Sequence, residues 1–93
     1  MEHTGPYALV LSPLFVRVLK SLKRKNGDVL KELDRSVEKI LREPTLGKPL
    51  RNTLRNYRRV HVGGSFVLLY EILGDEVRLL DFDHHDRVYK KYT

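Results

Sequence analysis

Residues Tyr57–Phe82 read YRRVHVGGSFVLLYEILGDEVRLLDF, three apolar or alternating runs separated by two short turn segments. The turn segments, Gly63-Gly64-Ser65 and Gly74-Asp75, contain the small residues that hairpin connections require. β-Branched and other apolar residues dominate the runs between them, which is typical of strands. The pattern therefore predicts a three-stranded antiparallel meander, with strands at Tyr57–Val62, Phe66–Leu73 and Val77–Phe82.

A short strand and a helix are predicted near the start of the chain. Tyr7–Leu11 is an apolar run with strand character, and Ser12-Pro13 supplies a favourable N-cap followed by proline at the first helical position. Within Pro13–Lys25, apolar residues recur at helical spacing, at Phe15, Leu19 and Leu22. Asn26-Gly27 is expected to end this helix.

A second helix follows after a very short loop. Asp28 is placed to cap it, and Glu43-Pro44 ends it. Its apolar positions follow the helical period, at Leu30, Leu33, Val37, Ile40 and Leu41. Two helices joined by so short a loop are expected to form an antiparallel hairpin. From Thr45 to Asn56 the chain is rich in Pro, Gly, Lys, Arg and Asn, which predicts a basic connector with room for one helical turn.

These elements fit one architecture. The helical hairpin needs an apolar surface to cover, and the sheet needs one covered face. We therefore expect an α+β fold with an N-terminal strand, an antiparallel helical hairpin and then a three-stranded antiparallel meander, the helices being packed on one face of a twisted sheet. At 93 residues the chain has the length of a single domain, 1–93.

The composition excludes several classes of protein. The chain contains no cysteine, which excludes disulfide frameworks, thiolate zinc sites and thiol nucleophiles. Its apolar stretches are far shorter than the about 20 residues of a membrane-spanning helix, so no membrane association is expected. No segment resembles a signal peptide, and a cytoplasmic location is expected. A chain of this size has little room for a large internal cavity, so neither a cofactor nor a small-molecule ligand is expected.

The charge of the chain is unevenly distributed. Lys and Arg number 18 against 12 Asp and Glu, and the formal net charge of +6 favours a polyanionic partner such as nucleic acid or an acidic protein. The excess is concentrated in Pro44–Tyr70, which contains no acidic residue. Besides Arg59, the candidate ligands of phosphate groups are Lys48, Arg51, Arg55 and Arg58 from this segment and Arg87 near the C-terminus.

Strand alternation singles out two residues of the first meander strand. Successive side chains point to opposite faces, so Val60 and Val62 share one face while Arg59 and His61 share the other. If the valines meet the helices, Arg59 and His61 project together from the open face. A guanidinium binds phosphate oxygens and an imidazole moves protons near neutral pH, so the pair is a candidate site. A merely solvated polar face is the alternative that this pattern leaves open.

A second candidate follows the last strand, in Asp83-His84-His85-Asp86-Arg87-Val88-Tyr89. Adjacent histidines point in opposite directions in an extended chain, so one can reach a site while the other packs or caps. His and Asp side chains also bind metal ions, but the spacing is poor for two histidines on one ion, and no metal site is expected. A strand end without any chemistry stays open as the alternative.

Five short motifs follow one another in the second half of the chain. They are Gly47-Lys-Pro-Leu50 with Leu54, Tyr57-Arg-Arg-Val-His-Val-Gly63, Leu69-Tyr-Glu-Ile72, Leu79-Leu80, and His84-His-Asp-Arg-Val-Tyr89. In this order, and with the predicted strand, hairpin and meander, the sequence resembles the RelE/ParE superfamily of bacterial and archaeal toxins. The resemblance implies a small toxin of a type II toxin–antitoxin system that is neutralised by a cognate antitoxin protein.

The RelE branch of this superfamily implies an enzymatic activity. Its members are mRNA interferases, ribosome-dependent endoribonucleases that cut mRNA in the ribosomal A site. A ribose 2′-hydroxyl attacks the neighbouring phosphate, and no metal is required. By position, the resemblance implies that Arg59 clamps the phosphate and that His61 and His85 are the acid and base, in an order left open. Tyr89 matches the terminal aromatic residue that stacks on a base.

One position departs from the pattern of active relatives, which usually carry an Arg on the central strand where this chain has Val67. Loss of a transition-state cation lowers a rate by orders of magnitude. Arg87 and Arg58 are the available substitutes, and Arg58 is the weaker because it points to the opposite face. Two other functions therefore stay open: a ParE-like toxin that inhibits DNA gyrase by binding, and a catalytically degenerate homologue that still binds an antitoxin.

Overall fold

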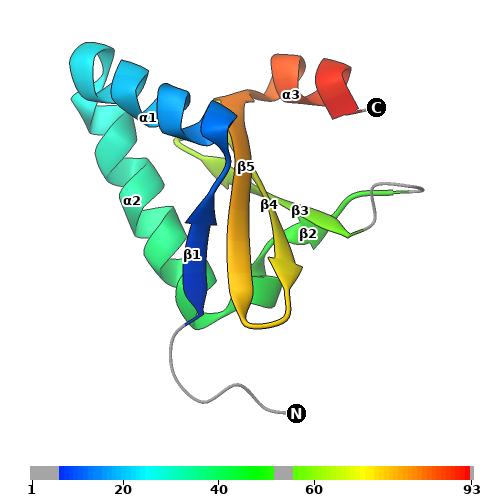
Figure 1. Cartoon of the computed structure of the whole chain (residues 1–93). Coiled ribbons are helices and arrows are strands. Elements are labelled where there is room, and N and C mark those ends of the chain that lie inside the picture. The colour runs from blue at the N-terminus through cyan, green and yellow to red at the C-terminus, as the bar shows by residue number, and fades with distance from the viewer. Residues whose placement is uncertain (1–6, 52–55, 93) are drawn as a thin grey trace.

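The structure, a computed structural model, describes residues 7–51 and 56–92. The first half contains a strand, β1 (Ala8–Leu11), and the two helices of a hairpin, α1 (Pro13–Lys25) and α2 (Gly27–Arg42) (Figure 1). A short 3-10 turn, η1 (Pro44–Leu46), and a two-residue strand, β2 (Lys48–Pro49), follow. The second half contains β3 (Tyr57–Val62), β4 (Phe66–Leu73), β5 (Glu76–His84) and a final helix, α3 (His85–Tyr92).

All five strands join one sheet in the order β1-β5-β4-β3-β2. Strands β3, β4 and β5 form the predicted antiparallel meander, and β2 adds an antiparallel strand beside β3. β1 pairs in parallel with β5, so that Ala8 lies opposite Glu76. The α+β fold is confirmed, and β1 and β2 form the two edges of the sheet.

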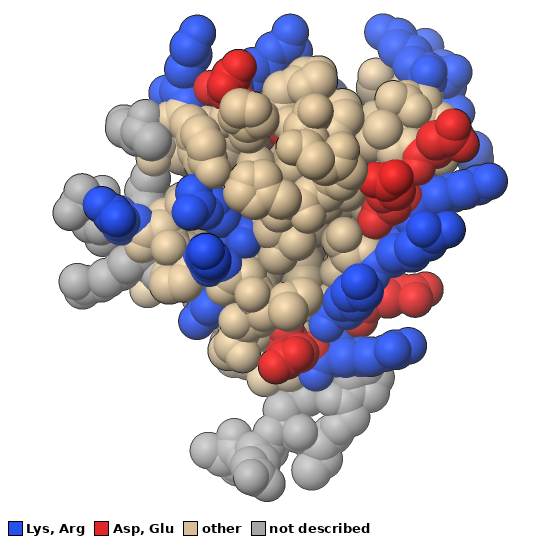
Figure 2. Space-filling view, turned by 180° about the vertical axis from the view of Figure 1, so that it is seen from behind, with Lys and Arg blue, Asp and Glu red and all other residues tan. Residues whose placement is uncertain are grey.

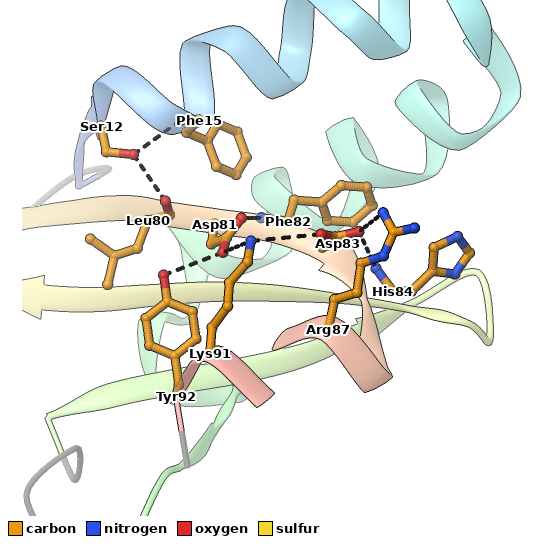
Figure 3. A network of polar contacts seen from close by, with 10 residues as sticks. All are labelled: Ser12, Phe15, Leu80, Asp81, Phe82, Asp83, His84, Arg87, Lys91 and Tyr92. Atoms are coloured by element: carbon orange, nitrogen blue, oxygen red, sulfur yellow. Dashed lines mark hydrogen bonds and ion pairs between the residues drawn. The ribbon is translucent and has the colours of Figure 1, made fainter. Parts of the chain in front are cut away.

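Ser12 ties the start of α1 to the sheet. Its Oγ accepts a hydrogen bond from the backbone N–H of Phe15 (3.1 Å), as an N-cap does, and donates to the carbonyl of Leu80 in β5 (2.9 Å) (Figure 3). Pro13 occupies the first helical turn, where a missing N–H costs nothing. The predicted cap of α1 is therefore confirmed, and the same hydroxyl also fixes the helix to β5.

The cap of α2 is not Asp28, as the sequence suggested, but Asn26. The Oδ1 of Asn26 accepts from the backbone N–H of Val29 (3.3 Å), and the backbone N–H of Asn26 donates to the carbonyl of Leu22 (2.8 Å). The reason is that Gly27 is already helical, so the helix begins two residues earlier than a cap at Asp28 implies. Asp28 lies in the first turn, where a carboxylate stabilises the positive end of the helix dipole.

The main core lies between the helical hairpin and one face of the sheet. Phe15 of α1 and Leu33 and Ile40 of α2 are almost completely buried there. Full burial of a side chain of this size contributes about 1.5–3 kcal/mol, so this layer supplies most of the apolar stabilisation. The buried sheet residues that face the hairpin are Val62, Leu68, Tyr70, Val77, Leu79 and Phe82.

A bulge in β5 decides which of its side chains face the hairpin. Leu69 of β4 pairs with Asp81, but the next residue, Tyr70, pairs with Leu79, so Leu80 is an extra residue. A bulge of this kind shifts the alternation of side chains by one position. Leu79 and Phe82 therefore both enter the core although they are three residues apart, and Asp81 is turned to the opposite face.

The opposite face is partly covered by α3, which packs against β4 and β5 and lies on the far side of the sheet from the hairpin (Figure 1). Val67, Leu69 and Val88 are buried. The sequence pattern does not predict this helix. The expectation of extended chain at His84 and His85 is wrong for His85, which is the first residue of α3. Eight residues are too few for a stable isolated helix, so α3 depends on its tertiary contacts.

Tyr70 holds part of the predicted connector against the sheet. Its buried hydroxyl donates to the carbonyl of Pro44 (2.7 Å) and accepts from the backbone N–H of Gly47 (2.8 Å). A Cβ at position 47 would lie only 2.6 Å from the Tyr70 hydroxyl oxygen, so only glycine fits there without a shift. The predicted helical turn is η1, and these bonds place β2 next to β3.

Candidate functional site

β3 places Arg59 and His61 on the sheet face opposite the helical hairpin. Val62 belongs to the core under the hairpin, and Val60 packs against that core. Arg59 instead contacts α3, and His61 is exposed. Since alternate residues of a strand share a face, the two side chains are neighbours, as the alternation of the sequence predicts.

Arg59 connects the sheet to α3 through Tyr89. Its Nη1 donates a hydrogen bond of 2.8 Å to the Tyr89 hydroxyl, and its Cζ lies 5.5 Å from the centre of the Tyr89 ring. The guanidinium therefore lies toward the hydroxyl end of the ring, and the hydrogen bond is the stronger contact. The Nε of Arg59 is buried and has no hydrogen-bond partner within the described residues. Such a buried donor costs about 1–3 kcal/mol, so Arg59 retains an unused donor in the site.

Lys48 lies beside Arg59 at the edge of the sheet, because β2 pairs with β3 in the register that sets these two residues opposite each other. Directly opposed side chains of antiparallel strands project to the same face, about 4.5–5.5 Å apart at Cβ. Figure 2 shows Lys and Arg side chains gathered on this side, at the left of the view, with no acidic side chain among them. Along the hairpin, by contrast, basic and acidic side chains alternate.

Two further members of the predicted basic set lie near this edge in the sequence. Arg51 is exposed. Arg55 lies outside the described residues, so its predicted role in phosphate binding stays a prediction.

His85 extends the site along α3. Its backbone N–H donates to the carbonyl of Ser65 (3.0 Å), which places the start of α3 beside the turn between β3 and β4. Tyr89 follows one helical turn later, and the ring centroids of His85 and Tyr89 are 6.2 Å apart. The Nδ1 of His85 lies 3.0 Å from a carboxylate oxygen of Asp86, which is itself exposed. The structure thus brings Arg59, Tyr89 and His85 together.

His61 stands at the same end of the sheet but apart from this group. It forms a cross-strand row with Val67 of β4 and Asp83 of β5. Its side chain makes no hydrogen bond, ion pair or ring contact with any residue that the structure describes. His61 is therefore free to meet a ligand, and it approaches the site from the side of β3, whereas His85 approaches from α3.

Val67 is fully buried on the face that α3 covers, directly opposite His61. Apolar packing thus occupies the position at which the family resemblance leads one to expect an Arg. Two cations contact Asp83, the residue that pairs with Val67: Nη1 of Arg87 lies 3.6 Å from its Oδ1, and Nζ of Lys91 lies 3.6 Å from its Oδ2. Arg87 is 70% exposed and has the reach to turn toward a ligand.

Arg58 is engaged elsewhere. Its Nη1 donates to the carbonyl of Gly47 (2.7 Å) and more weakly to that of Thr45 (3.3 Å), which fastens η1 to β3. The expectation that Arg58 points away from Arg59 and His61 agrees with these contacts. Its predicted part in RNA binding stays a prediction, and the contacts give it a structural role in addition.

Sequence reasoning missed a buried carboxylate close to the site. Asp81 is 1% exposed, and its Oδ2 accepts hydrogen bonds from Nζ of Lys91 (3.0 Å) and from the hydroxyl of Tyr92 (3.3 Å) (Figure 3). Burial, reinforced by Asp81, raises the pKa of Tyr92 to about 12. The hydrogen bond to Asp81 likewise raises the pKa of Lys91. The available signal was an Asp between two apolar residues of a strand, since aspartate is rarely buried unless it is paired.

Two structural findings bear on other kinds of site. In residues 7–51 and 56–92, no three His, Asp or Glu side chains are grouped as a metal ion would require. The described helices are all too short or too polar to cross a membrane.

The chain is similar to known toxins in sequence and in structure. Residues 9–89 match the family described as "ParE toxin of type II toxin-antitoxin system, parDE". The chain is 36% identical over 89 residues to the Methanocaldococcus jannaschii protein named "Putative toxin RelE4", a match that covers 91% of this chain and 93% of that protein.

Solved structures give the same result. The YoeB/ParE toxin from Agrobacterium tumefaciens has a TM-score of 0.76 at 14% identity, covering 84% of this chain and 98% of that one. A chain of the toxin–antitoxin complex RelBE2 from Mycobacterium tuberculosis has a TM-score of 0.65 at 30% identity, covering 87% and 100%.

The sheet with a helical hairpin on one face, together with the family match over most of the chain, defines a toxin of the type II toxin–antitoxin class. The chain belongs to the RelE/ParE superfamily, as its sequence motifs predict.

Proposed function

We propose that this protein is a ribosome-dependent endoribonuclease that cleaves mRNA in the ribosomal A site, and that its 93 residues act as one toxin domain. The observation that carries the proposal is the group formed by Arg59, Tyr89 and His85, in which Arg59 keeps a buried and unused Nε–H. A guanidinium, a phenol and an imidazole side by side supply the groups that RNA cleavage needs when no metal takes part.

Arg59 serves as the phosphate clamp. In the free protein its Nη1 bonds the Tyr89 hydroxyl, a single neutral acceptor. A phosphate carries negative charge and can accept two parallel bonds from one guanidinium, so the exchange of Tyr89 for phosphate is favourable. The exchange also releases the ring of Tyr89 to stack on a base, an interaction worth about 1–3 kcal/mol in single-stranded nucleic acid complexes.

His61 and His85 carry the two proton transfers. One imidazole takes the proton of the ribose 2′-hydroxyl while this oxygen bonds to the neighbouring phosphorus. The other gives a proton to the departing 5′-oxygen as its bond to phosphorus breaks, so the products are a 2′,3′-cyclic phosphate and a free 5′-hydroxyl. One imidazole comes from β3 and the other from α3, so the two can approach one phosphate from different directions.

Two further cations support the clamp. Lys48 lies next to Arg59 at the sheet edge, and Arg87 contacts Asp83, the residue that pairs with Val67. Because Val67 is apolar and buried, Arg87 supplies the positive charge that active relatives place on the central strand. With Arg51 and the predicted contribution of Arg55, these residues form a basic edge that follows the RNA backbone.

The proposed protein partner is a cognate antitoxin. Its support comes from similar toxins solved in complexes described as toxin–antitoxin, among them RelBE2 from Mycobacterium tuberculosis and DinJ–YafQ from E. coli. An acidic segment of the antitoxin would lie over the basic edge and neutralise Lys48 and Arg59. The affinity should then fall as salt rises, and an affinity that salt leaves unchanged would exclude charge as the driving force.

The experiment adds the purified protein to a reconstituted translation system and maps new 5′ ends on the mRNA. The variants are Arg59→Ala, His61→Ala and His85→Ala, and His84→Ala is the matched control because His84 stacks on Phe66 rather than facing the site. We expect cleavage by the native chain and by His84→Ala, and loss of about 100-fold or more in the three site variants.

The alternative functions give different results in the same assay. Intact messages together with a loss of gyrase-dependent supercoiling would replace the nuclease with a gyrase-binding toxin. Intact messages and normal supercoiling, with antitoxin binding retained, would identify a homologue in which the loss of the central-strand Arg at Val67 ended catalysis.

A further inference from the structure

Asp81 and Arg59 lie in one cross-strand row on the face that α3 covers, with Leu69 between them. Because neighbouring strands are about 4.8 Å apart, the two backbones are separated by about 10 Å. α3 bridges this distance with two tyrosines: Tyr89 bonds Arg59 at one end of the row, and Tyr92 bonds Asp81 at the other. Residues three apart lie on the same side of a helix, so both contacts depend on one orientation of α3.

Of the two ends of this row, the Asp81 end is more deeply buried than the Arg59 end. The carboxylate is 1% exposed, and both of its oxygens are used: Oδ1 accepts from the backbone N–H of Phe82 (2.8 Å), and Oδ2 accepts from Lys91 and Tyr92. A buried carboxylate is tolerated only when it is paired and hydrogen bonded. Lys91 and Tyr92 are therefore held at Asp81, because moving either away would leave the charge poorly satisfied.

The other contacts of α3 hold it less firmly. Val88 is its single buried residue among the eight. The ion pair between Arg87 and Asp83 has a separation of 3.6 Å, and its Arg87 side is 70% exposed, so solvent weakens it. Figure 3 shows Lys91 and Tyr92 both directed at Asp81, at 3.0 and 3.3 Å from its Oδ2. Lys91 also lies 3.6 Å from Oδ2 of Asp83, a longer contact, and Arg87 meets Oδ1 of Asp83 nearer the start of the helix. Asp81 is thus the main polar anchor of the C-terminal turn of α3.

We propose that Asp81 is a positioning residue for the site: through Lys91 and Tyr92 it sets the orientation of α3 that places Tyr89 against Arg59 and His85 beside the β3–β4 turn. The inference rests on the proposed nuclease function only for what the positioned residues do. Asp81 itself points at the C-terminal turn of α3 and takes no part in proton transfer.

The test compares Asp81→Asn with Glu76→Gln in the full chain. Both variants remove one carboxylate charge from β5, but Glu76 pairs with Arg78 in an exposed ion pair (3.1 Å) far from α3. Hydrogen exchange of the α3 amides and the NMR contact between the Tyr89 ring and the Arg59 guanidinium report the geometry without any need for activity. The kcat and KM of mRNA cleavage report its effect on the reaction.

We expect Asp81→Asn to speed exchange along α3, to remove the Tyr89–Arg59 contact and to lower kcat by about 100-fold while KM changes little, because misplacement by about 1 Å is enough for such a loss. Glu76→Gln should change none of these. Lys91→Met provides a second route, since Lys91 is 44% exposed and its replacement removes nothing from the apolar core. It should reproduce the release of α3 even where Asp81→Asn does not fold.

The outcomes separate the two proposals. If hydrogen exchange of α3 and the Tyr89–Arg59 contact stay native in folded Asp81→Asn and Lys91→Met, Asp81 does not position the site. A raised KM with an unchanged kcat would also overturn the inference, since it would indicate a role in binding alone. If the native chain does not cleave mRNA but Asp81→Asn and Lys91→Met both release α3, the nuclease function fails and the positioning of Tyr89 by Asp81 stands.

Discussion

The hydroxyl of Tyr70 lies 2.8 Å from the backbone nitrogen of Gly47, a residue 23 positions earlier in the chain. Tyr70 comes from the central strand, and Gly47 directly precedes Lys48, the residue that pairs with Arg59 at the sheet edge. One buried hydroxyl in the main core therefore fixes the position of the basic edge on the other side of the sheet.

Tyr70→Phe should lower the free energy of unfolding by about 1–3 kcal/mol, because the N–H of Gly47 and the carbonyl of Pro44 lose a buried partner. Urea denaturation measures the change. Tyr57→Phe is the matched control, since the Tyr57 hydroxyl makes no hydrogen bond with the described residues. An equal and small change in both variants would show that the Tyr70 bonds do not stabilise the connector.

Gly47→Ala should destabilise the folded protein more than Gly27→Ala does. The new Cβ at position 47 would meet the Tyr70 hydroxyl at 2.6 Å and the backbone carbonyl oxygen of Arg59 at 2.9 Å, and overpacking of this kind costs about 1–3 kcal/mol. At Gly27 nothing lies within 4 Å, and alanine is the better helix former, so stability should stay level or rise. Thermal unfolding of the two variants side by side gives the answer, and a stable Gly47→Ala would contradict the close approach.

Stability should fall at alkaline pH because of groups at the C-terminus. Burial raises the pKa of Tyr92 from 10.0 to about 12, and the hydrogen bond to Asp81 raises the pKa of Lys91 above 10.5. The folded state thus keeps these protons to higher pH than the unfolded state does. Their contribution is fully present below about pH 10 and is lost as pH rises toward 12.

Unfolding free energies measured from neutral pH to about pH 12 check this, with Tyr92→Phe as the comparison. The variant should show a shallower decline, though not a flat one, since burial also raises the pKa of Tyr70. If the unfolding free energy of Tyr92→Phe falls with pH as steeply as that of the native chain, folding does not raise the pKa of Tyr92.

Arg87→Ala should lower mRNA cleavage strongly while changing the free energy of unfolding only slightly. Its Nη1 lies 3.6 Å from Oδ1 of Asp83 and its side chain is 70% exposed, so loss of this ion pair should cost no more than about 1 kcal/mol. If Arg87 supplies the missing cation, cleavage should fall by about 100-fold. Arg17→Ala, at an exposed position of α1, controls for the loss of one positive charge, and equal cleavage by both variants would remove Arg87 from the site.

Val67→Arg restores the residue type of active relatives but should not restore their activity. The side chain is fully buried on the face that α3 covers, and an unpaired charge there costs about 3–5 kcal/mol. We expect a large loss of stability by denaturant unfolding and release of α3 in hydrogen exchange. Leu73→Arg, on the same strand but 46% exposed, should be close to neutral. A stable and faster Val67→Arg enzyme would show that the packing beneath α3 readily admits a charge.

Much of this fold is predictable because its long elements follow local rules. The alternation in Tyr57–Val62 and the helical spacing in Pro13–Lys25 both agree with the observed β3 and α1. β2 and α3 were missed because they are short and have little intrinsic preference for their structure. β2 depends on the Tyr70 hydroxyl and α3 on Asp81, and neither contact leaves a local pattern.

The site was predictable to a similar degree. Alternation places Arg59 and His61 on the correct face, and the family resemblance brings in His85 and Tyr89. Alternation fails for Asp81, because strict counting from Val77 would put it in the core beside Leu79. The bulge at Leu80 turns it to the other face, and nothing in the sequence marks that extra residue.

The parallel pairing of β1 with β5 has a consequence for the newly made chain. Ser12 and Leu80 hydrogen bond across a separation of 68 residues, so β1 has no neighbour in the sheet until the last strand has been synthesised. Contacts between such distant segments form late, because the entropy of closing a long loop must be overcome first. A ribosome that makes this protein thus holds an unfinished sheet until β5 has emerged. Arg59 likewise meets Tyr89 only when α3 has emerged, so the site assembles after all five strands have been made.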